Sequence, residues 1–276
     1  MNRVSVVVTL GLCVLAACSF SPNLTRLSAE GPASQPAGEL ALDLGNQVTM
    51  KLVLIPAGKF QMGSPAGEQG RNPNEGPQHE VTITKPFYMG VCEVSLGQYQ
   101  ALMGKKAADA DTANSEAAVA NISWDDAAKF CAKMSAKTGK TVSLPTEAQW
   151  EYACRAGSNT RFHYGDDNGN EKLVDYAWYN KTSGGLAHPG GQKKPNAWGL
   201  FDMHGNVSEW CADWYADSYA GAGAVDPQGP ATGTARVLRG GSWDDDAPDC
   251  RCAYRFSIAP GDRSIGYGFR VVVDAK

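Results

Sequence analysis

The sequence predicts a mixed α+β domain with short strands, a few helices and much irregular structure. The 31 glycines and 15 prolines of this 276-residue chain place many residues in turns and loops. Apolar and alternating runs are short, which indicates brief strands. Separate hydroxyl residues, each followed three positions later by a glutamine or an aspartate, mark the starts of helices.

The expected strands lie near both ends of the domain. Residues 50–62 predict two short strands around a Pro-Ala-Gly turn, and residues 81–94 return to strand character. Residues 266–273 predict a terminal strand that is buried in the domain. Between the first two segments, residues 64–80 are polar and rich in Gly, Pro and Asn, which predicts an exposed loop.

Three helices are expected from their capping residues. Ser95 and Thr146 each stand three positions before a glutamine, the pattern in which hydroxyl and amide satisfy each other's backbone donors. Ser123 stands in the same way before an aspartate. After Ser123 the apolar residues recur at helical spacing and include Cys131, which we interpret as a buried core thiol.

The N-terminus predicts a signal peptide in residues 1–17. A positive charge at Arg3 precedes a run of 14 uncharged residues, too short to span a bilayer. Leu-Ala-Ala before Cys18 resembles a bacterial lipobox, so Cys18 is expected to carry the lipid, the other possibility being an ordinary signal peptide. Ser19 then favours the outer membrane, with the protein facing the periplasm or the cell surface. Residues 18–45 are expected to tether a domain of residues 46–276.

Charge and cysteine content narrow the range of functions that the chain could have. The net charge of −4 and the lack of Lys/Arg runs argue against a nucleic-acid partner. Beyond Cys18 the chain keeps an even set of cysteines, which permits disulfides in an exported protein without fixing their pairing. The six are Cys92, Cys131, Cys154, Cys211, Cys250 and Cys252.

Six segments together match one family in its own order. They are LIPAGKFQMGS (54–64), SWDDA (123–127), LPTEAQWEY (144–152), GLFDMHGNVSEW (199–210), RGGSW (239–243) and GFR (268–270). On these segments the sequence resembles the formylglycine-generating enzyme, or sulfatase-modifying factor, family. The resemblance implies a complex variant of the C-type-lectin-like fold over roughly residues 50–273.

The copper chemistry of the family's oxidases fits this chain poorly. The resemblance implies two cysteine ligands, three and eight residues after the serine of the Gly-Gly-Ser motif, which is Ser242 here. Asp245 occupies the first of these positions and Cys250 the second. Because a hard carboxylate does not replace a thiolate for Cu(I), a two-cysteine copper site is not expected. Ser242 and Cys250 remain the candidate catalytic residues.

The remaining cysteines have two interpretations. The resemblance implies a disulfide between Cys154 and Cys252, and Cys211 and Cys250 are then a possible second pair. Alternatively, Cys250 and Cys252 would project from one face of an extended strand and could meet one metal ion. The four histidines show no spacing typical of an iron site, and we interpret them as packing residues.

Calcium is the cofactor that the resemblance favours. The family's Gly-Asn-x-x-Glu-Trp turn would supply the side chains of Asp202 and Glu209 and the carbonyls of Gly205 and Val207. Carboxylate and carbonyl oxygens in a tight turn suit a hard cation. The alternative is that the two carboxylates cap the turn without a metal.

Two functions remain open at this stage. One is an envelope lipoprotein that recognises or matures a protein or peptide partner, with residues 243–263 as its binding face. The other is a working oxidase that converts a sulfatase cysteine to formylglycine. Asp245 favours the first, whereas Ser242 and Cys250 keep the second open.

Overall fold

The computed structural model describes residue 1 and residues 38–104 and 114–275. The predicted signal peptide and Cys18 lie outside these residues. The chain divides into residues 1–31 and a unit of residues 32–276, and every element below belongs to the second unit. Among the described helices none is both long and apolar enough to cross a membrane.

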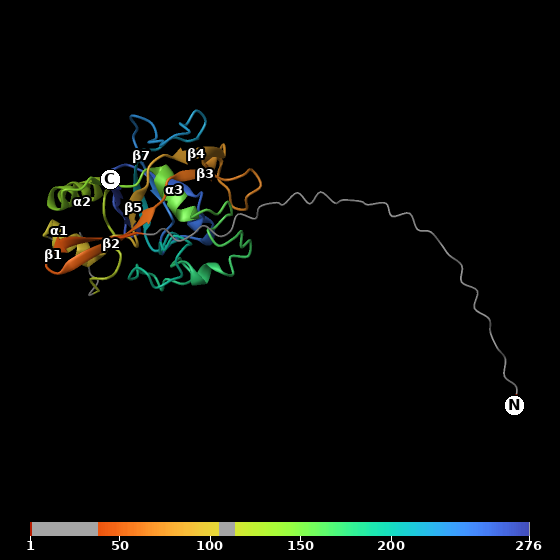
Figure 1. The fold of residues 1–276 in the computed structure, drawn as a ribbon, viewed down its shortest axis with the longest axis horizontal. Helices are drawn as coiled ribbons and strands as arrows, with labels where there is room; N and C mark the ends of the chain where they lie inside the picture. Colours follow the sequence, from red (N-terminus) through yellow and green to blue (C-terminus); the bar gives the residue numbers. More distant parts are fainter. Residues whose placement is uncertain (2–37, 105–113, 276) are drawn as a thin grey trace. The chain divides into compact units, whose positions relative to one another are not determined.

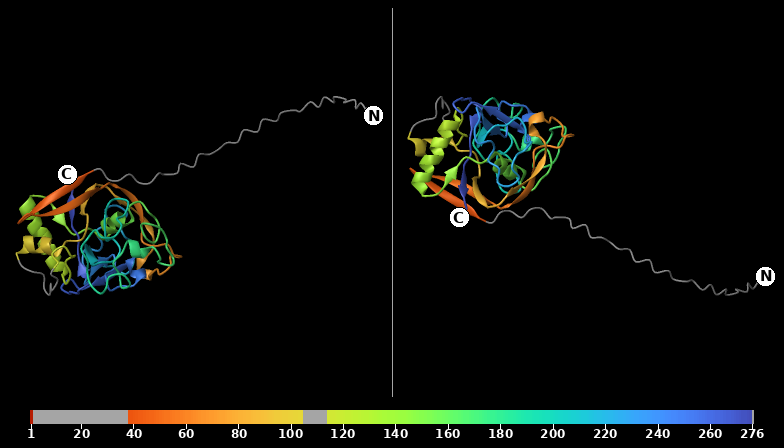
Figure 2. Two further views of the ribbon diagram at one scale, coloured as in Figure 1. Left: turned by 90° about the horizontal axis from the view of Figure 1, so that it is seen from below. Right: turned by 90° about the horizontal axis from the view of Figure 1, so that it is seen from above.

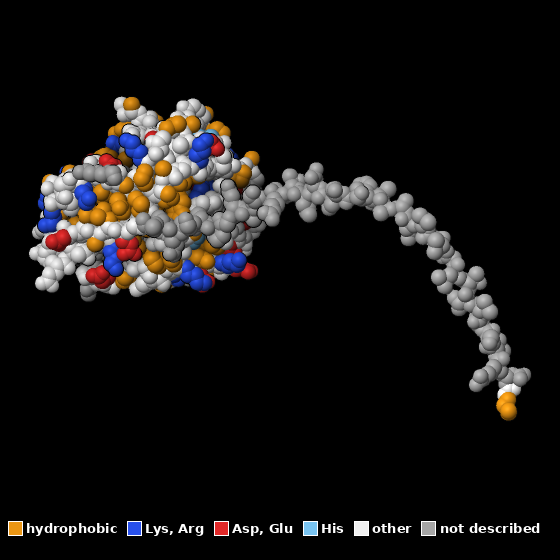
Figure 3. Space-filling view, viewed as in Figure 1, with side chains coloured by type: hydrophobic (Ala, Val, Ile, Leu, Met, Phe, Trp, Pro, Cys, Tyr) orange, Lys and Arg blue, Asp and Glu red, His pale blue; other side chains and the backbone are white. Residues whose placement is uncertain are grey.

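The larger sheet collects strands from both ends of the domain (Figure 1). In spatial order its strands are β1 (Glu39–Gly45), β2 (Val48–Ile55), β5 (Phe87–Gly90), β11 (Val272–Asp274) and β6 (Val142–Ser143). All its pairings are antiparallel. On the face drawn in Figure 3, hydrophobic side chains gather over β2 and β5, where Leu54 and Tyr88 pair across the strands and are partly exposed.

Two smaller sheets complete the framework. One pairs β3 (Gly58–Met62) with β4 (His79–Ile83), and the other has four strands. The four are, in spatial order, β10 (Tyr267–Gly268), β7 (Ser208–Trp214), β8 (Arg236–Arg239) and β9 (Arg255–Ile258). The expected strand pair at 50–62 is therefore present, but β2 and β3 join different sheets. The terminal segment is likewise split between β10 and β11.

The three expected helices begin where their caps predict. They are α1 (Leu96–Met103), α2 (Trp124–Thr138) and α3 (Glu147–Arg155). Ser95 and Thr146 form complete capping boxes, and the Ser123 side chain accepts from the Asp126 amide. Helices α1 and α2 pack against each other beside the large sheet, where α1 contacts β1 and β2 and α2 contacts β1 and β6 (Figures 1 and 2). Cys131 is buried on α2, as predicted.

Helix α3 lies between the sheets and carries ion pairs into the core. Its Glu147 and Glu151 are both buried. Glu147 pairs with Arg255, and Glu151 pairs with Arg155 and Arg239. Because a buried guanidinium is costly unless its partner is present, these pairs fix α3 against β8 and β9. In the described part of the chain, three short 3-10 helices interrupt the long connections: η1 (Pro73–Glu75), η2 (Leu173–Asp175) and η3 (Ala247–Cys250).

Two expectations about segment boundaries are corrected. Residues 39–45, assigned to the tether, form β1, because Leu40, Leu42 and Leu44 alternate toward the core. The segment 64–80 is not a uniformly exposed loop. It includes η1, and its Glu75 is buried in a bidentate ion pair with Arg251.

Candidate functional site

A small pocket opens beside Ser242, at one end of the four-stranded sheet. Its volume is about 170 Å³. It is bounded by the start of β7, the turn after β8, and side chains of β9 and β10. The lining residues are Ser208, Ser242, Trp243, Asp244, Asp245, Tyr254, Phe256, Ser264, Ile265, Gly266 and Tyr267.

The Asp245 side chain is hydrogen-bonded to the Ser242 turn. One carboxylate oxygen accepts from the Ser242 amide at 2.7 Å and from the Ser242 hydroxyl at 2.8 Å. Gly240 and Gly241 precede the serine with φ of 94° and 72°, a backbone conformation that favours glycine. Ser242 is therefore a turn residue, and its hydroxyl is already bound to a side chain.

Cys250 does not line this pocket. Its side chain is fully buried, and its thiol donates to the Asp246 carbonyl at 3.8 Å. Burial, followed by the charges of Asp245 and Asp249, raises the pKa of the Cys250 thiol well above its usual range. The Cys250 sulfur lies against Gly241 of the Gly-Gly-Ser turn but does not reach the pocket, and none of the residues lining the pocket is a cysteine. The pocket does not fit Cu(I) bound by two thiolates.

The surroundings of the pocket are acidic. Its lining residues include Asp244 and Asp245 and no Lys, Arg or His. Asp249, nearby on η3, has its pKa raised to about 6 by burial and then by Asp245. Burial and the charges of Asp249 and Asp245 also raise the pKa of Tyr254. A cationic group would find complementary charge here.

The residues of the expected calcium turn lie together just before and within β7. Asp202, Gly205 and Val207 are buried in the turn, and Asp202 accepts from the Gly191 amide at 2.8 Å. Gly205 has φ of 81°, and a side chain there would meet the Trp178 carbonyl oxygen at 2.1 Å. Glu209, in β7, makes a bidentate ion pair with Arg270 at 2.6 and 2.7 Å.

Glu93 is a further acidic residue at this turn that the sequence did not reveal. Burial and then the charge of Asp202 raise the pKa of Glu93 well above its usual range, and burial also raises the pKa of Asp202. One oxygen of Glu93 (Oε2) and one of Asp202 (Oδ1) are buried without a hydrogen-bond partner. Together with Glu209, these carboxylates outnumber the single guanidinium of Arg270, and the two unpartnered oxygens of Glu93 and Asp202 are hard donors of the kind that calcium binds. The one available signal was an isolated carboxylate within the apolar run around residue 93.

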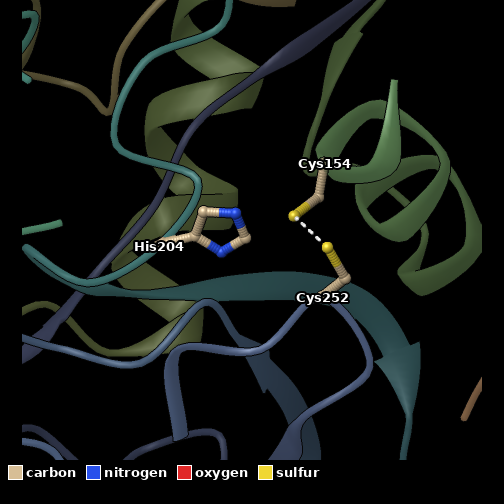
Figure 4. Close-up of side chains that lie close together, drawn as sticks. All are labelled: Cys154, His204 and Cys252. Carbon is tan, nitrogen blue, oxygen red and sulfur yellow. Dashed lines mark hydrogen bonds between the residues drawn. The ribbon is translucent and has the colours of Figure 1, made fainter. Parts of the chain in front are cut away.

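A separate cluster brings Cys154, His204 and Cys252 together, as Figure 4 shows. The Cys154 and Cys252 sulfurs are 3.6 Å apart, and both residues are free thiols. The structure therefore places the expected disulfide partners side by side without an S–S bond. Cys211 and Cys250 are also free thiols and belong to different apolar clusters, and residues 250 and 252 do not share a strand.

A larger cavity of about 350 Å³ lies at the other end of β7, under residues 216–230. Asp213, Trp214 and Arg255 contribute to its walls. Burial, followed by the charge of Glu147, raises the pKa of Asp213 to about 7. The two cavities thus lie at opposite ends of one strand, and only the smaller one contains the Gly-Gly-Ser turn.

Comparisons with known proteins agree with this architecture. Residues 42–275 match the sulfatase-modifying factor enzyme 1-like domain. The chain is 30% identical over 322 aligned residues to the formylglycine-generating enzyme of Streptomyces coelicolor, covering 92% of this chain and 96% of that protein. The structure of PvdO from Pseudomonas aeruginosa superposes with a TM-score of 0.77 at 32% identity, covering 90% of this chain and 100% of PvdO.

Treponema denticola variable protein 1 is similar to a comparable degree. Its TM-score is 0.75 at 30% identity, and the match covers 86% of this chain and 99% of that protein. The family match runs from within β1 to the end of β11. The chain therefore belongs to the sulfatase-modifying factor family, with the formylglycine-generating enzyme type of fold.

Proposed function

We propose that this chain is an envelope-anchored, non-oxidase member of the family that recognises or matures a protein or peptide partner through the Ser242 pocket. One observation carries the proposal: the Asp245 carboxylate binds both the amide and the hydroxyl of Ser242, where the oxidases are expected to keep a thiol. The turn is occupied by its own side chain and offers no thiolate pair for copper.

Exposed hydrophobic side chains beside the pocket support a macromolecular partner. Phe256 is 40% exposed and Ile265 is 59% exposed, and both line the pocket with Trp243 and Tyr267. Apolar and aromatic side chains gathered around a polar pocket are typical of protein-binding surfaces. The acidic surroundings add a preference for a partner segment that carries positive charge.

Calcium is proposed as a structural cofactor of the same region. Glu93, Asp202 and Glu209 would hold it with the carbonyls of Gly205 and Val207. The ion would balance the excess of buried carboxylate charge and fix the turn before β7. Since Ser208, the next residue along, lines the pocket, an ordered turn would also hold that wall in place.

The lipid anchor at Cys18 is proposed from the sequence alone. It would attach the domain to the envelope, most naturally to the outer membrane. Growth with a labelled fatty acid tests this, because label should enter the wild-type chain and not a Cys18→Ser variant. Equal labelling of the two chains would contradict the anchor.

Partner binding is tested by placing a photo-crosslinking amino acid at Ile265 in cells. The matched control places it at Leu186, which is 49% exposed and does not line the pocket. We expect a defined crosslinked species from position 265 and not from position 186. Identical patterns from the two positions would contradict recognition at this pocket.

The alternative function, a working formylglycine-generating oxidase, keeps support from the 30% identity to the Streptomyces coelicolor enzyme. It is tested by incubating the purified chain with a CxPxR peptide, copper and oxygen. The proposal expects no aldehyde product by mass spectrometry. Conversion of the peptide cysteine to formylglycine would overturn it.

A further inference from the structure

We propose that the Ser242 pocket receives one lysine side chain of the partner, with the ammonium group at Asp245 and the aliphatic stem along aromatic walls. Lysine would be the group by which the proposed function recognises its partner, so its assignment rests on that function. The pocket volume of about 170 Å³ lies below the ~300–1,000 Å³ that is typical of sites for small molecules. A cavity of this size suits one extended side chain.

The negative charge around the pocket has no ionic partner within the described part of the chain. Five aspartates lie in the pocket wall or beside it, and none of them forms an ion pair there: Asp244, Asp245, Asp246, Asp249 and Asp262. Arg251 and Arg263, which are close to this set in the sequence, are already paired with other carboxylates. The charge of Asp262 reaches the pocket, because burial, Asp245 and Asp262 raise the pKa of Tyr267. A cationic side chain would offset this excess of negative charge.

Four aromatic rings supply the apolar part of the pocket wall: Trp243, Tyr254, Phe256 and Tyr267. Within the described residues none of these rings has a cationic group over its face. The rings of Trp124 and Trp214 differ, because the Arg236 guanidinium lies over both. Uncovered aromatic faces beside unpaired carboxylates attract an ammonium group through the ring electrons and through charge. The methylene stem of a lysine would pack along the same rings.

The hydrogen bonds of Asp245 favour lysine over arginine. One of its carboxylate oxygens (Oδ2) already accepts from the Ser242 amide and hydroxyl, which leaves Oδ1 for a ligand. A guanidinium binds best when a carboxylate offers both oxygens to its planar fork, whereas an ammonium donates single hydrogen bonds in three directions. The rings of Phe256 and Tyr267 are tilted by 47°, so they form no parallel slot for a guanidinium plane.

Peptides that differ at one residue test the assignment on the purified full-length chain. The probes are acetyl-Ala-Ala-Xaa-Ala-Ala-amide with lysine, arginine or norleucine at Xaa, and NMR titration at millimolar concentration measures their affinities. We expect the lysine peptide to bind about tenfold more tightly than the arginine peptide, the effect of one charge-assisted hydrogen bond, and the norleucine peptide to bind most weakly. Equal affinities for lysine and arginine, or no binding of the lysine peptide, would overturn the proposal.

Variants locate the binding at the pocket. Asp245→Asn keeps an oxygen for Ser242 but replaces the free oxygen with an amide that only donates, so it should lower affinity for the lysine peptide about tenfold. Phe256→Ala should lower it as well, because it removes an exposed ring. The matched control is Asp217→Asn, an exposed aspartate outside the pocket, which should leave the affinity unchanged. Circular dichroism checks folding, and the three peptides on the wild-type chain decide the question if a variant is unfolded. Equal affinity in the wild type and Asp245→Asn would contradict the assignment.

The crosslinking experiment at Ile265 distinguishes failure of lysine binding from failure of the proposed function. A defined crosslinked species, together with equal binding of the lysine and arginine peptides, would leave partner recognition in place and exclude lysine as the group recognised. Identical crosslinking patterns from positions 265 and 186 would contradict the proposed function and the lysine assignment with it.

Discussion

At the scale of single residues, the Ser242 turn departs from the two-cysteine site that the resemblance implies for the family's oxidases. Asp245 satisfies the two donors of Ser242, while Cys250 is fully buried and does not line the pocket. Restoring a thiol at residue 245 would therefore supply one soft ligand and not two.

Asp245→Cys is accordingly expected to leave the chain without oxidase activity. The new thiol would line the pocket, but the Cys250 sulfur is fully buried and would stay hydrogen-bonded to the Asp246 carbonyl. The measurement is mass spectrometry of a CxPxR peptide after incubation with the variant, copper and oxygen. The Streptomyces coelicolor enzyme serves as the positive control, and aldehyde formation by the variant would refute this reasoning.

At the calcium turn, we expect calcium to reverse the order of the melting temperatures of the wild type and a Glu93→Gln variant. Without calcium, Glu93→Gln should melt at the same temperature as the wild type or higher, because it removes a buried carboxylate whose pKa is raised by burial and Asp202. With calcium at about 100 times Kd the wild type should gain about 2.7 kcal/mol and become the more stable protein. Thermal melting of the two proteins, with calcium and with a chelator, measures their stabilities in each condition. An unchanged ranking would contradict the site.

The sequence could indicate only part of these sites. Asp202 and Glu209 belong to one short motif, so their proximity follows from the turn between them. Glu93 follows β5 in the chain and lies close to these two residues only in the folded protein. No local sequence pattern predicts that proximity. The pairing of Cys154 with Cys252 came from the family resemblance, because six cysteines allow fifteen pairings.

At the scale of elements, the helices show which features are local. Their starts were predictable because a hydroxyl and a residue three positions later satisfy backbone donors within one turn. The pairing partners of the strands were not predictable in this way, since β2 pairs with β1 and β5 whereas β3 pairs with β4. Sheet membership depends on contacts between segments far apart in the chain, which periodicity does not reveal.

The cap of α3 should have a measurable effect because this helix carries Glu147, Glu151 and Cys154. Thr146→Ala removes the hydroxyl that accepts from the Gln149 amide at 3.1 Å. We expect a loss of about 1 kcal/mol in the free energy of unfolding, measured with urea. The matched control is Thr138→Ala, whose hydroxyl donates to the Met134 carbonyl of an already formed turn. A loss no greater than that of the control would contradict the capping role.

At the scale of the whole molecule, β1 determines where the domain begins. A chain that starts at residue 38 keeps the strand, whereas one that starts at residue 46 loses the buried side chains of Leu42 and Leu44 and exposes the edge of β2. Loss of a buried leucine costs about 2–5 kcal/mol. We therefore expect the shorter chain to unfold at a clearly lower urea concentration or to aggregate. Equal urea midpoints for the two chains would mean that residues 39–45 belong to the tether and not to the folded domain.

Acid stability depends on buried groups of two kinds that act in opposite directions. Burial lowers the pKa of His163 to about 2 and that of His204 to about 4, so the unfolded chain binds protons below its ordinary histidine pKa and the folded chain does not. Their stabilisation is present above pH ~6.5 and is lost as the pH falls. Asp213, whose pKa is raised to about 7 by burial and Glu147, contributes stability at low pH that is lost as the pH rises through 7.

The histidine contribution can be isolated with His163→Gln, which keeps a donor for His204 and removes one titrating ring. Between pH 7.5 and pH 5 a histidine with an unfolded pKa of about 6.5 and a much lower folded pKa should cost roughly 2 kcal/mol. Urea unfolding of both proteins at the two pH values should show that the variant loses less stability than the wild type by about that amount. Because Asp213 is present in both proteins, its opposite effect cancels in the comparison. Parallel losses would mean that the His163 ring is protonated in the folded chain as easily as in the unfolded one.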